Sequence, residues 1–177
     1  MQSPSPQASH DGFPFFLDRA AAEQAVALVL PSIDAALGNA AVGESGILYI
    51  VIMNPALQPW EATFEEAILL EHAVGDRDGW DADYAAYARA KARTAWRLGG
   101  DTHTLGTVAP HRLRAGDAGV WGSAIVDGIV VATSGMNPWY DEAFSGAIAY
   151  ALRAVAKGRA LARPPSLRLD AGDAPRG

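Results

Sequence analysis

Lys91 is the strongest candidate in this sequence for a ligand-binding or catalytic side chain. It lies in the alanine-rich segment 81–98, which we expect to be helical, and it shares one helical face with Trp80, Tyr84 and Tyr87. A lysine on such a face can pair with a ligand carboxylate or with an acidic side chain across a pocket. If desolvated, it can act as a base or nucleophile. The alternative is a lysine whose stem covers Tyr84 or Tyr87 while its ammonium stays in water.

Two adjacent carboxylates, Asp141 and Glu142, follow near the start of the last expected helix. Neighbouring residues on a helix point about 100° apart, so the pair does not form an acid/base dyad. Either one could meet Lys91 across a pocket, and Glu142 is a second candidate base. The simpler interpretation is that at least one of them only compensates the positive end of the helix dipole.

The segment Ser134-Gly135-Met136-Asn137 leads from an expected strand into that helix. Free backbone N–H groups and the helix dipole make a helix N-terminus a site where anions bind readily. Trp139, together with Tyr84 or Tyr87, could then wall a cleft for a ligand with an anionic end and a flat or apolar body. An ordinary capped helix with nothing bound is the alternative.

Other catalytic and metal-binding patterns are missing from the sequence. There is no cysteine, which excludes thiolate nucleophiles and Cys-ligated metals. The histidines, His10, His72, His103 and His111, show no metal-ligand spacing, and we interpret each as structural. Walker, GxGxxG and GxSxG motifs are also absent, which disfavours nucleotide hydrolysis, dinucleotide binding and serine-esterase chemistry. We therefore expect no metal site.

The elements that must position these residues begin with a helix over 17–37. Its apolar positions Val26, Leu30, Ile33 and Leu37 share one face, and Pro31 should kink it. The continuously apolar run 47–53 predicts a central strand buried on both faces.

Residues 63–74 are ambiguous between helix and strand. Thr63 and Glu66 form a capping-box pattern, which favours a helix, whereas the apolar residues 67–70 could begin a strand. The loop 104–110, flanked by His103 and His111, follows the helix that carries Lys91.

A hairpin is expected over 120–134, because Asp127-Gly128 between two apolar runs is typical of a type I′ turn. The last helix begins after Asn137, and Phe144, Ile148, Ala151 and Val155 should form its buried stripe. The order helix, strand, probable strand, helix, hairpin, helix predicts an α/β (α+β) fold, in which helices cover a mostly antiparallel sheet.

The 177-residue length and the 50% share of hydrophobic residues fit one domain with a real core. We place it at 13–162, between a disordered tail at 1–12 and a flexible tail at 163–177. The net charge of −6 and the scattered positive residues disfavour nucleic acid as a partner. No stretch approaches the roughly 20 apolar residues of a membrane span, and residues 1–16 do not read as a signal peptide. A cytoplasmic location, with no membrane partner, is the expectation.

Residues 121–135, WGSAIVDGIVVATSG, resemble the terminal hairpin of GlcG/HbpS-like domains, which is followed by an acidic pair matched here by Asp141 and Glu142. Upstream, Asp78-Gly79 precedes the run KARTA at 91–95 with the spacing typical of the family. The strand 47–53 after the first helix is a weaker match. The resemblance covers roughly residues 17–157, with a longer segment than usual after that strand. Some haem-binding members use a histidine of the first helix, and this helix has none.

The resemblance implies a layered, profilin-like domain that binds a small molecule and assembles into homo-oligomers. The family's best-known ligand class is haem or another tetrapyrrole, so haem is the cofactor to test, although the sequence leaves the cofactor unknown. Three functions stay open: a module binding a planar or carboxylate-bearing ligand, an enzyme on a small metabolite with Lys91 or Glu142 as base, and a structural oligomer without ligand. The expected ligand-binding residues are Tyr84, Tyr87, Lys91, Ser134, Gly135, Asn137, Trp139, Asp141 and Glu142.

Overall fold

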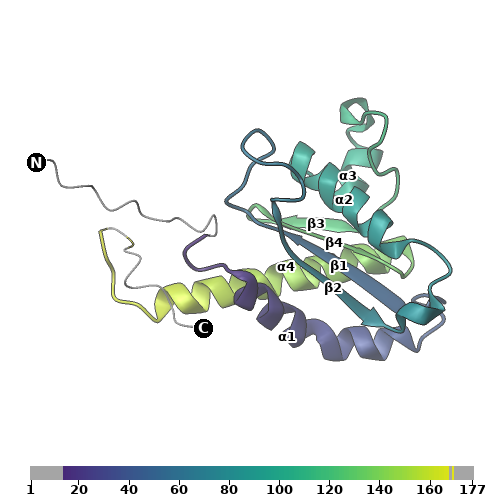
Figure 1. Ribbon diagram of the computed structural model, residues 1–177, viewed down its shortest axis with the longest axis horizontal. Helices are drawn as coiled ribbons and strands as arrows, with labels where there is room; N and C mark the ends of the chain where they lie inside the picture. Colours follow the sequence, from purple (N-terminus) through teal and green to yellow (C-terminus); the bar gives the residue numbers. More distant parts are fainter. Residues whose placement is uncertain (1–13, 168, 170–177) are drawn as a thin grey trace, which may run out of the picture.

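The computed structural model of the protein describes residues 14–167 and residue 169 (Figure 1). The predicted tail 1–12 lies outside the described residues. Of the predicted tail 163–177, residue 168 and residues 170–177 lie outside them as well. The helices of the described chain are α1 (Arg19–Leu37), α2 (Tyr84–Leu98), α3 (Thr102–Thr107) and α4 (Pro138–Leu161). Its strands are β1 (Ile47–Met53), β2 (Ile68–Gly75), β3 (Ser123–Val126) and β4 (Ile129–Ser134).

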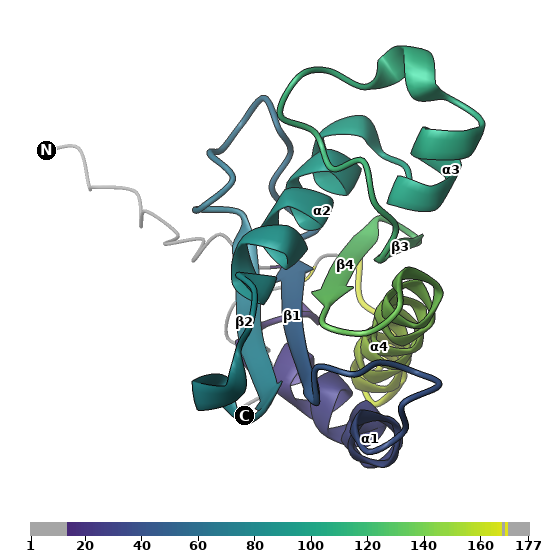
Figure 2. The same cartoon turned by 90° about the vertical axis from the view of Figure 1, so that its right-hand side faces the viewer.

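The four strands form one antiparallel sheet in the order β2-β1-β4-β3. Helices α1 and α4 pack on one face and α2 packs on the other, so the molecule has three layers (Figure 2). The α+β fold class predicted from the sequence is therefore confirmed. The predicted central strand is also confirmed, because all seven residues of β1 are buried between β2 and β4.

Alternation along β1 divides the core in two. Leu48, Ile50 and Ile52 pack in the cluster shared with α1 and α4, whereas Tyr49 and Val51 pack in the cluster shared with α2. Successive side chains of a strand point to opposite faces, so a continuously apolar strand supplies both clusters at once.

The ambiguous segment contains both of the features that its sequence suggested. Thr63 and Glu66 make the reciprocal capping-box bonds, with Thr63 N donating to Glu66 Oε2 at 2.8 Å and Glu66 N donating to Thr63 Oγ1 at 3.3 Å. The box closes a short turn rather than a helix, and β2 begins at Ile68. The strand interpretation is confirmed, since pairing with β1 outweighs a local helix signal.

The predicted hairpin is present with a tighter start than expected. Val126 pairs with Ile129 across a two-residue turn, and both Asp127 and Gly128 have positive φ, at 49° and 84°. These are the signs that a type I′ turn requires. The first hairpin strand starts at Ser123 rather than at residue 121.

Three helix predictions need correction. Helix α2 starts at Tyr84 rather than 81, because the side chain of Asp83 caps it by accepting from Ala86 N. The expected loop 104–110 begins instead within a helix, α3, which ends at Thr107 and which Asp101 caps in the same way. The buried stripe of α4 comprises Asp141, Ser145, Ile148, Ala149 and Leu152, while Phe144, Ala151 and Val155 are only partly buried.

Helix α1 differs from the sequence expectation in another respect. It is long and apolar enough, by length and composition alone, to pass as a membrane span, although no such stretch was expected. Its apolar face packs on α4 and β2 through residues such as Ala22, Val26 and Ile33. A core helix of a soluble domain has the same composition, so the test does not distinguish the two.

Candidate functional site

Lys91 and Asp141 form a buried ion pair where the end of β4 lies between α2 and α4. Lys91 Nζ donates to Asp141 Oδ2 at 2.8 Å, and the two side chains are 3% and 2% exposed. Lys91 comes from the sheet-facing side of α2, and Asp141 from the first turn of α4. The interpretation of Lys91 as a surface lysine with its ammonium in water is therefore wrong, and the expected pairing with an acidic residue of α4 is present.

The ammonium of Lys91 has no free hydrogen-bond donor. Besides Asp141 it meets the Thr133 carbonyl oxygen at 2.9 Å and Ser134 Oγ at 3.4 Å. An ammonium group has three N–H donors, and these three acceptors match them. A ligand carboxylate could reach this lysine only by displacing one of them.

Burial shifts both pKa values toward the neutral forms. Desolvation raises the pKa of Asp141 from 3.8 to about 6, opposed by the nearby Lys91 charge and by hydrogen bonds that include Met136 N. Desolvation also lowers the pKa of Lys91, opposed by the Asp141 charge. Perturbed values of this kind occur at functional sites, but structural ion pairs produce them as well.

Gly122 makes room for the pair and was not singled out in the sequence. Its φ is 125°, and a Cβ there would lie 2.5 Å from Lys91 Nζ and 2.8 Å from Asp141 Cβ. Its carbonyl oxygen accepts from Ser145 Oγ at 2.9 Å, which ties this turn to α4. A glycine at the edge of an expected strand was the available signal, because such a residue often marks a close approach.

The N-terminus of α4 is bonded within the protein. Met136 N donates to Asp141 Oδ1 at 3.0 Å, and Asn137 N donates to the Val42 carbonyl oxygen at 2.9 Å. The side chain of Asn137 makes no capping bond and donates instead to the Ala41 carbonyl oxygen at 3.2 Å. The donors on which an anion site was expected to depend are thus largely occupied.

A polar cleft of about 510 Å³ borders this turn. It brings together three expected ligand-binding residues, Tyr84, Gly135 and Asn137. Its wall also includes Glu44, Ser45 and Asp81, and no lysine or arginine lines it. The phenol of Tyr84 donates to Asp81 Oδ1 at 2.5 Å, and this bond is the largest cause of a raised Tyr84 pKa.

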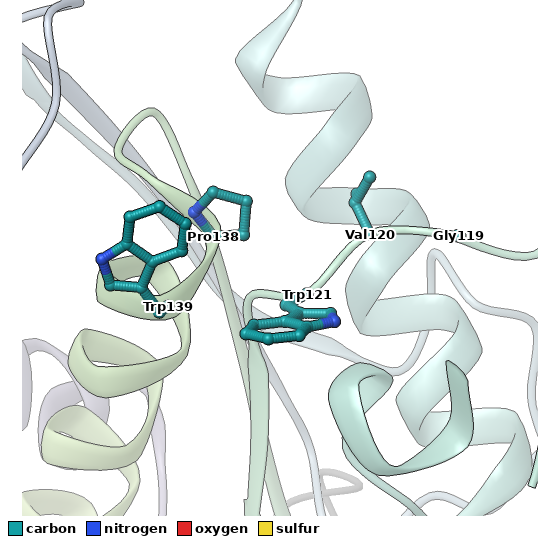
Figure 3. A pocket seen from close by; sticks show the side chains of 5 residues that line it. All are labelled: Gly119, Val120, Trp121, Pro138 and Trp139. Atoms are coloured by element: carbon teal, nitrogen blue, oxygen red, sulfur yellow. The ribbon is translucent and has the colours of Figure 1, made fainter. Parts of the chain in front are cut away.

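An apolar cleft of about 260 Å³ also borders the start of α4. Figure 3 shows Trp139, from the first turn of α4, and Trp121, from the segment entering β3, on either side of it, with Pro138 between them. Gly119 and Val120 complete the lining. The Trp139 side chain is 55% exposed, which is unusual for an aromatic residue whose role is only to fill a core.

Glu142 and His103 contact each other beside Trp121, one of the residues that line this cleft. The His103 ring stacks on Trp121 with centroids 3.8 Å apart, and His103 Nδ1 lies 3.2 Å from Glu142 Oε2. His103 was interpreted as structural from the sequence. Its contact with Trp121 could not be predicted from the sequence, because the two residues are distant along the chain. In the part of the chain that the structure describes, no three metal-binding side chains gather, and His72 is exposed on β2.

The expected site residues therefore separate into groups. Lys91, Ser134 and Asp141 form the buried network, Tyr84, Gly135 and Asn137 line the polar cleft, and Trp139 lines the apolar cleft. Glu142 contacts His103. Tyr87 is 54% exposed and lines neither cleft. The buried network lies at the same β4–α4 junction as the two clefts. The sequence predicted one shared pocket for all these residues, but the buried network does not open into one.

Comparison with known proteins gives a structural relationship. No protein-family profile matches the sequence, and no curated protein matches it. Among solved structures, a double mutant of HbpS from Streptomyces reticuli matches with a TM-score of 0.51 and 15% identity, over 85% of this chain and 97% of that one. At this identity the match concerns the fold alone, and the chain has an HbpS-like fold.

Proposed function

We propose that this protein is a small-ligand-binding domain and that the flat or apolar part of its ligand lies between Trp121 and Trp139. The observation that carries the proposal is the cleft bordered by these two indoles at the start of α4. Ligand sites are typically concave and lined mainly by apolar and aromatic side chains, with a few polar groups nearby. The HbpS-like fold is consistent with this function.

The cleft favours a compact ring system. Its volume of about 260 Å³ lies just below the range usual for drug-sized ligands, roughly 300–1,000 Å³. Haem or another tetrapyrrole, the ligand class suggested by the family resemblance, would insert one edge and leave the rest outside. A smaller planar molecule would fit as a whole.

The first experiment is to identify what the purified protein carries. Native mass spectrometry of protein from cells would reveal a bound small molecule, and an absorption spectrum with a Soret band would identify haem. Titration with hemin and with a bicyclic aromatic probe should then give saturable binding to the wild-type protein.

Trp139→Ala should weaken that binding by about tenfold, through loss of one aromatic wall. Trp60→Ala is the matched control, because Trp60 is 80% exposed and does not line the cleft. Equal binding by wild type and Trp139→Ala, or no binding of any probe, would contradict the proposal.

A second candidate function is catalysis with Glu142 as base, favoured by its contact with His103. A carboxylate beside Nδ1 fixes the imidazole orientation, as it does in many proton-transfer sites. Lys91, the other candidate base, would first have to leave Asp141. Turnover of a co-purified metabolite that is lost in Glu142→Gln, with ligand affinity retained, would support this alternative.

A further inference from the structure

The charged groups at the junction decide which kind of polar end a ligand can carry. Lys91 is matched by three acceptors, so its positive charge is already neutralised by Asp141. No lysine or arginine lines the apolar cleft. An anionic ligand would therefore find no free basic side chain among the cleft's lining residues.

Glu142 places the opposite charge beside the cleft. It follows Pro138 and Trp139 by four and three residues, so the three share one face of α4. Its Oε1 and Oε2 lie 3.5 Å and 3.2 Å from His103 Nδ1. The Glu142 side chain is one-third exposed, so a ligand cation beside Trp139 could be attracted by its carboxylate.

The two tryptophans supply the other half of a cation site. The face of an indole ring is electron-rich and attracts organic cations, and tryptophan is the most effective residue in this role. His103 stacks on Trp121 and so covers part of that ring, which restrains the indole beside the cleft. In Figure 3 the indole nitrogens of Trp121 and Trp139 both point away from the space between the rings. The two indole rings thus present carbon surface rather than their N–H groups to the space between them.

We propose that the cleft between Trp121 and Trp139 binds an organic cation, either a methylated ammonium group or a cationic heteroaromatic ring, with Glu142 as the neighbouring negative charge. This inference rests on the proposed function, because it uses the same cleft, and it assigns the charge of the ligand. Cation–π attraction to the indoles and Coulombic attraction to the carboxylate act in the same direction. A carboxylate-bearing ligand of equal shape would meet repulsion from Glu142.

The test compares probes that differ in charge. N-methylquinolinium is a bicyclic cation, and 2-naphthoate is a bicyclic anion of similar size. Choline and its neutral carbon isostere 3,3-dimethylbutan-1-ol make a second pair that isolates the ammonium charge. Isothermal titration calorimetry on the full chain at pH 8 gives each dissociation constant. We expect each cation to bind about tenfold or more tightly than its partner.

Three variants locate the effect. Trp139→Phe should keep part of the preference for cations and Trp139→Ala should remove most of it. Glu142→Gln should reduce cation affinity without reducing that of the neutral isostere. Trp60→Ala should behave as wild type. Melting temperatures check that each variant is folded.

Each outcome separates the two proposals. Tighter binding of the anion, or equal binding of charged and uncharged probes, overturns the cation assignment while leaving a ligand cleft in place. Binding of no aromatic or ammonium probe overturns the cation site and, with the hemin titration also negative, the proposed function. A cation preference that survives Trp139→Ala overturns the location.

Discussion

Lys91 and Asp141, 50 residues apart in sequence, meet at 2.8 Å with both side chains almost fully buried. Removing one partner should be costly, because it leaves an uncompensated buried charge. Lys91→Met should lower the free energy of unfolding by about 3–5 kcal/mol at pH 7. Urea unfolding followed by circular dichroism measures this.

The double variant Lys91→Met with Asp141→Asn should recover most of that loss, since no buried charge then remains unpaired. If the loss of unfolding free energy in the double variant equals the sum of the losses in the two single variants, the two side chains do not stabilise each other, which would contradict the prediction.

Asp141 should also make stability depend on pH. Its pKa is raised from 3.8 to about 6 in the folded protein, so the folded state holds more protons than the unfolded state between these values. The contribution of this group to stability is therefore largest below 3.8 and falls as the pH rises to about 6. The slope should be absent in Asp141→Asn.

Two measurements check this prediction. The Cγ chemical shift of Asp141 in carbon-13 NMR should titrate near pH 6. The difference in unfolding free energy between wild type and Asp141→Asn should become less favourable to wild type across the same window. A carboxyl that titrates near 4, with no pH-dependent difference, would contradict it.

Gly122 should tolerate no side chain. A Cβ would lie 2.5 Å from Lys91 Nζ, and the φ of 125° is one that other residues rarely adopt. Gly122→Ala should cost about 2 kcal/mol or more by overpacking and strain. Gly158→Ala is the control, because this exposed glycine of α4 has open space around it and alanine there should stabilise by about 0.5–1 kcal/mol.

The hairpin turn gives a fourth prediction. Gly128→Val should destabilise the protein by about 1–2 kcal/mol, because a β-branched residue resists the φ of 84° at this position. Gly128→Asn should cost less, since asparagine tolerates positive φ. Thermal unfolding of both variants is the measurement, and an unchanged melting temperature for valine would contradict the turn assignment.

Truncation gives the fifth. Removal of residues 1–12 and 165–177 should change the unfolding free energy by less than about 1 kcal/mol, because these segments lack an apolar pattern that could dock them. Leu169, however, lines an apolar groove with Phe15 and Phe16. Leu169→Ala alone shows whether any loss comes from that contact, and a large loss would mean that a terminal segment packs on the domain.

The sequence predicts the secondary structure well where local patterns and tertiary packing agree. The strand 47–53, the Asp127-Gly128 turn and the helix after Asn137 were all confirmed. Residues 102–107 were missed as a helix because α3 is short and depends on the Asp101 cap rather than on an apolar periodicity.

The site was harder to predict, because contacts between distant segments decide it. The sequence paired Lys91 with α4 but not with Asp141 in particular, since choosing between Asp141 and Glu142 requires the rotation of α4 against the sheet. No sequence pattern indicates that Lys91 and Asp141 approach Gly122 closely, or that His103 stacks on Trp121. Tyr87, three residues after Tyr84, was placed on the ligand face and is half exposed.

The crowding of Gly122 against Lys91 and Asp141 links three positions in how this protein can vary between species. A relative that replaces the lysine at position 91 by an apolar residue should also have lost the acid at position 141, because one charge alone is not tolerated there. Position 122 should remain glycine in either case, because a Cβ there would still meet the Thr133 carbonyl oxygen at 2.9 Å and the φ of 125° would be unchanged. Substitutions at positions 91 and 141 should therefore appear together in distant homologues beside an invariant glycine at 122, and that joint pattern would help to recognise them where overall identity is low.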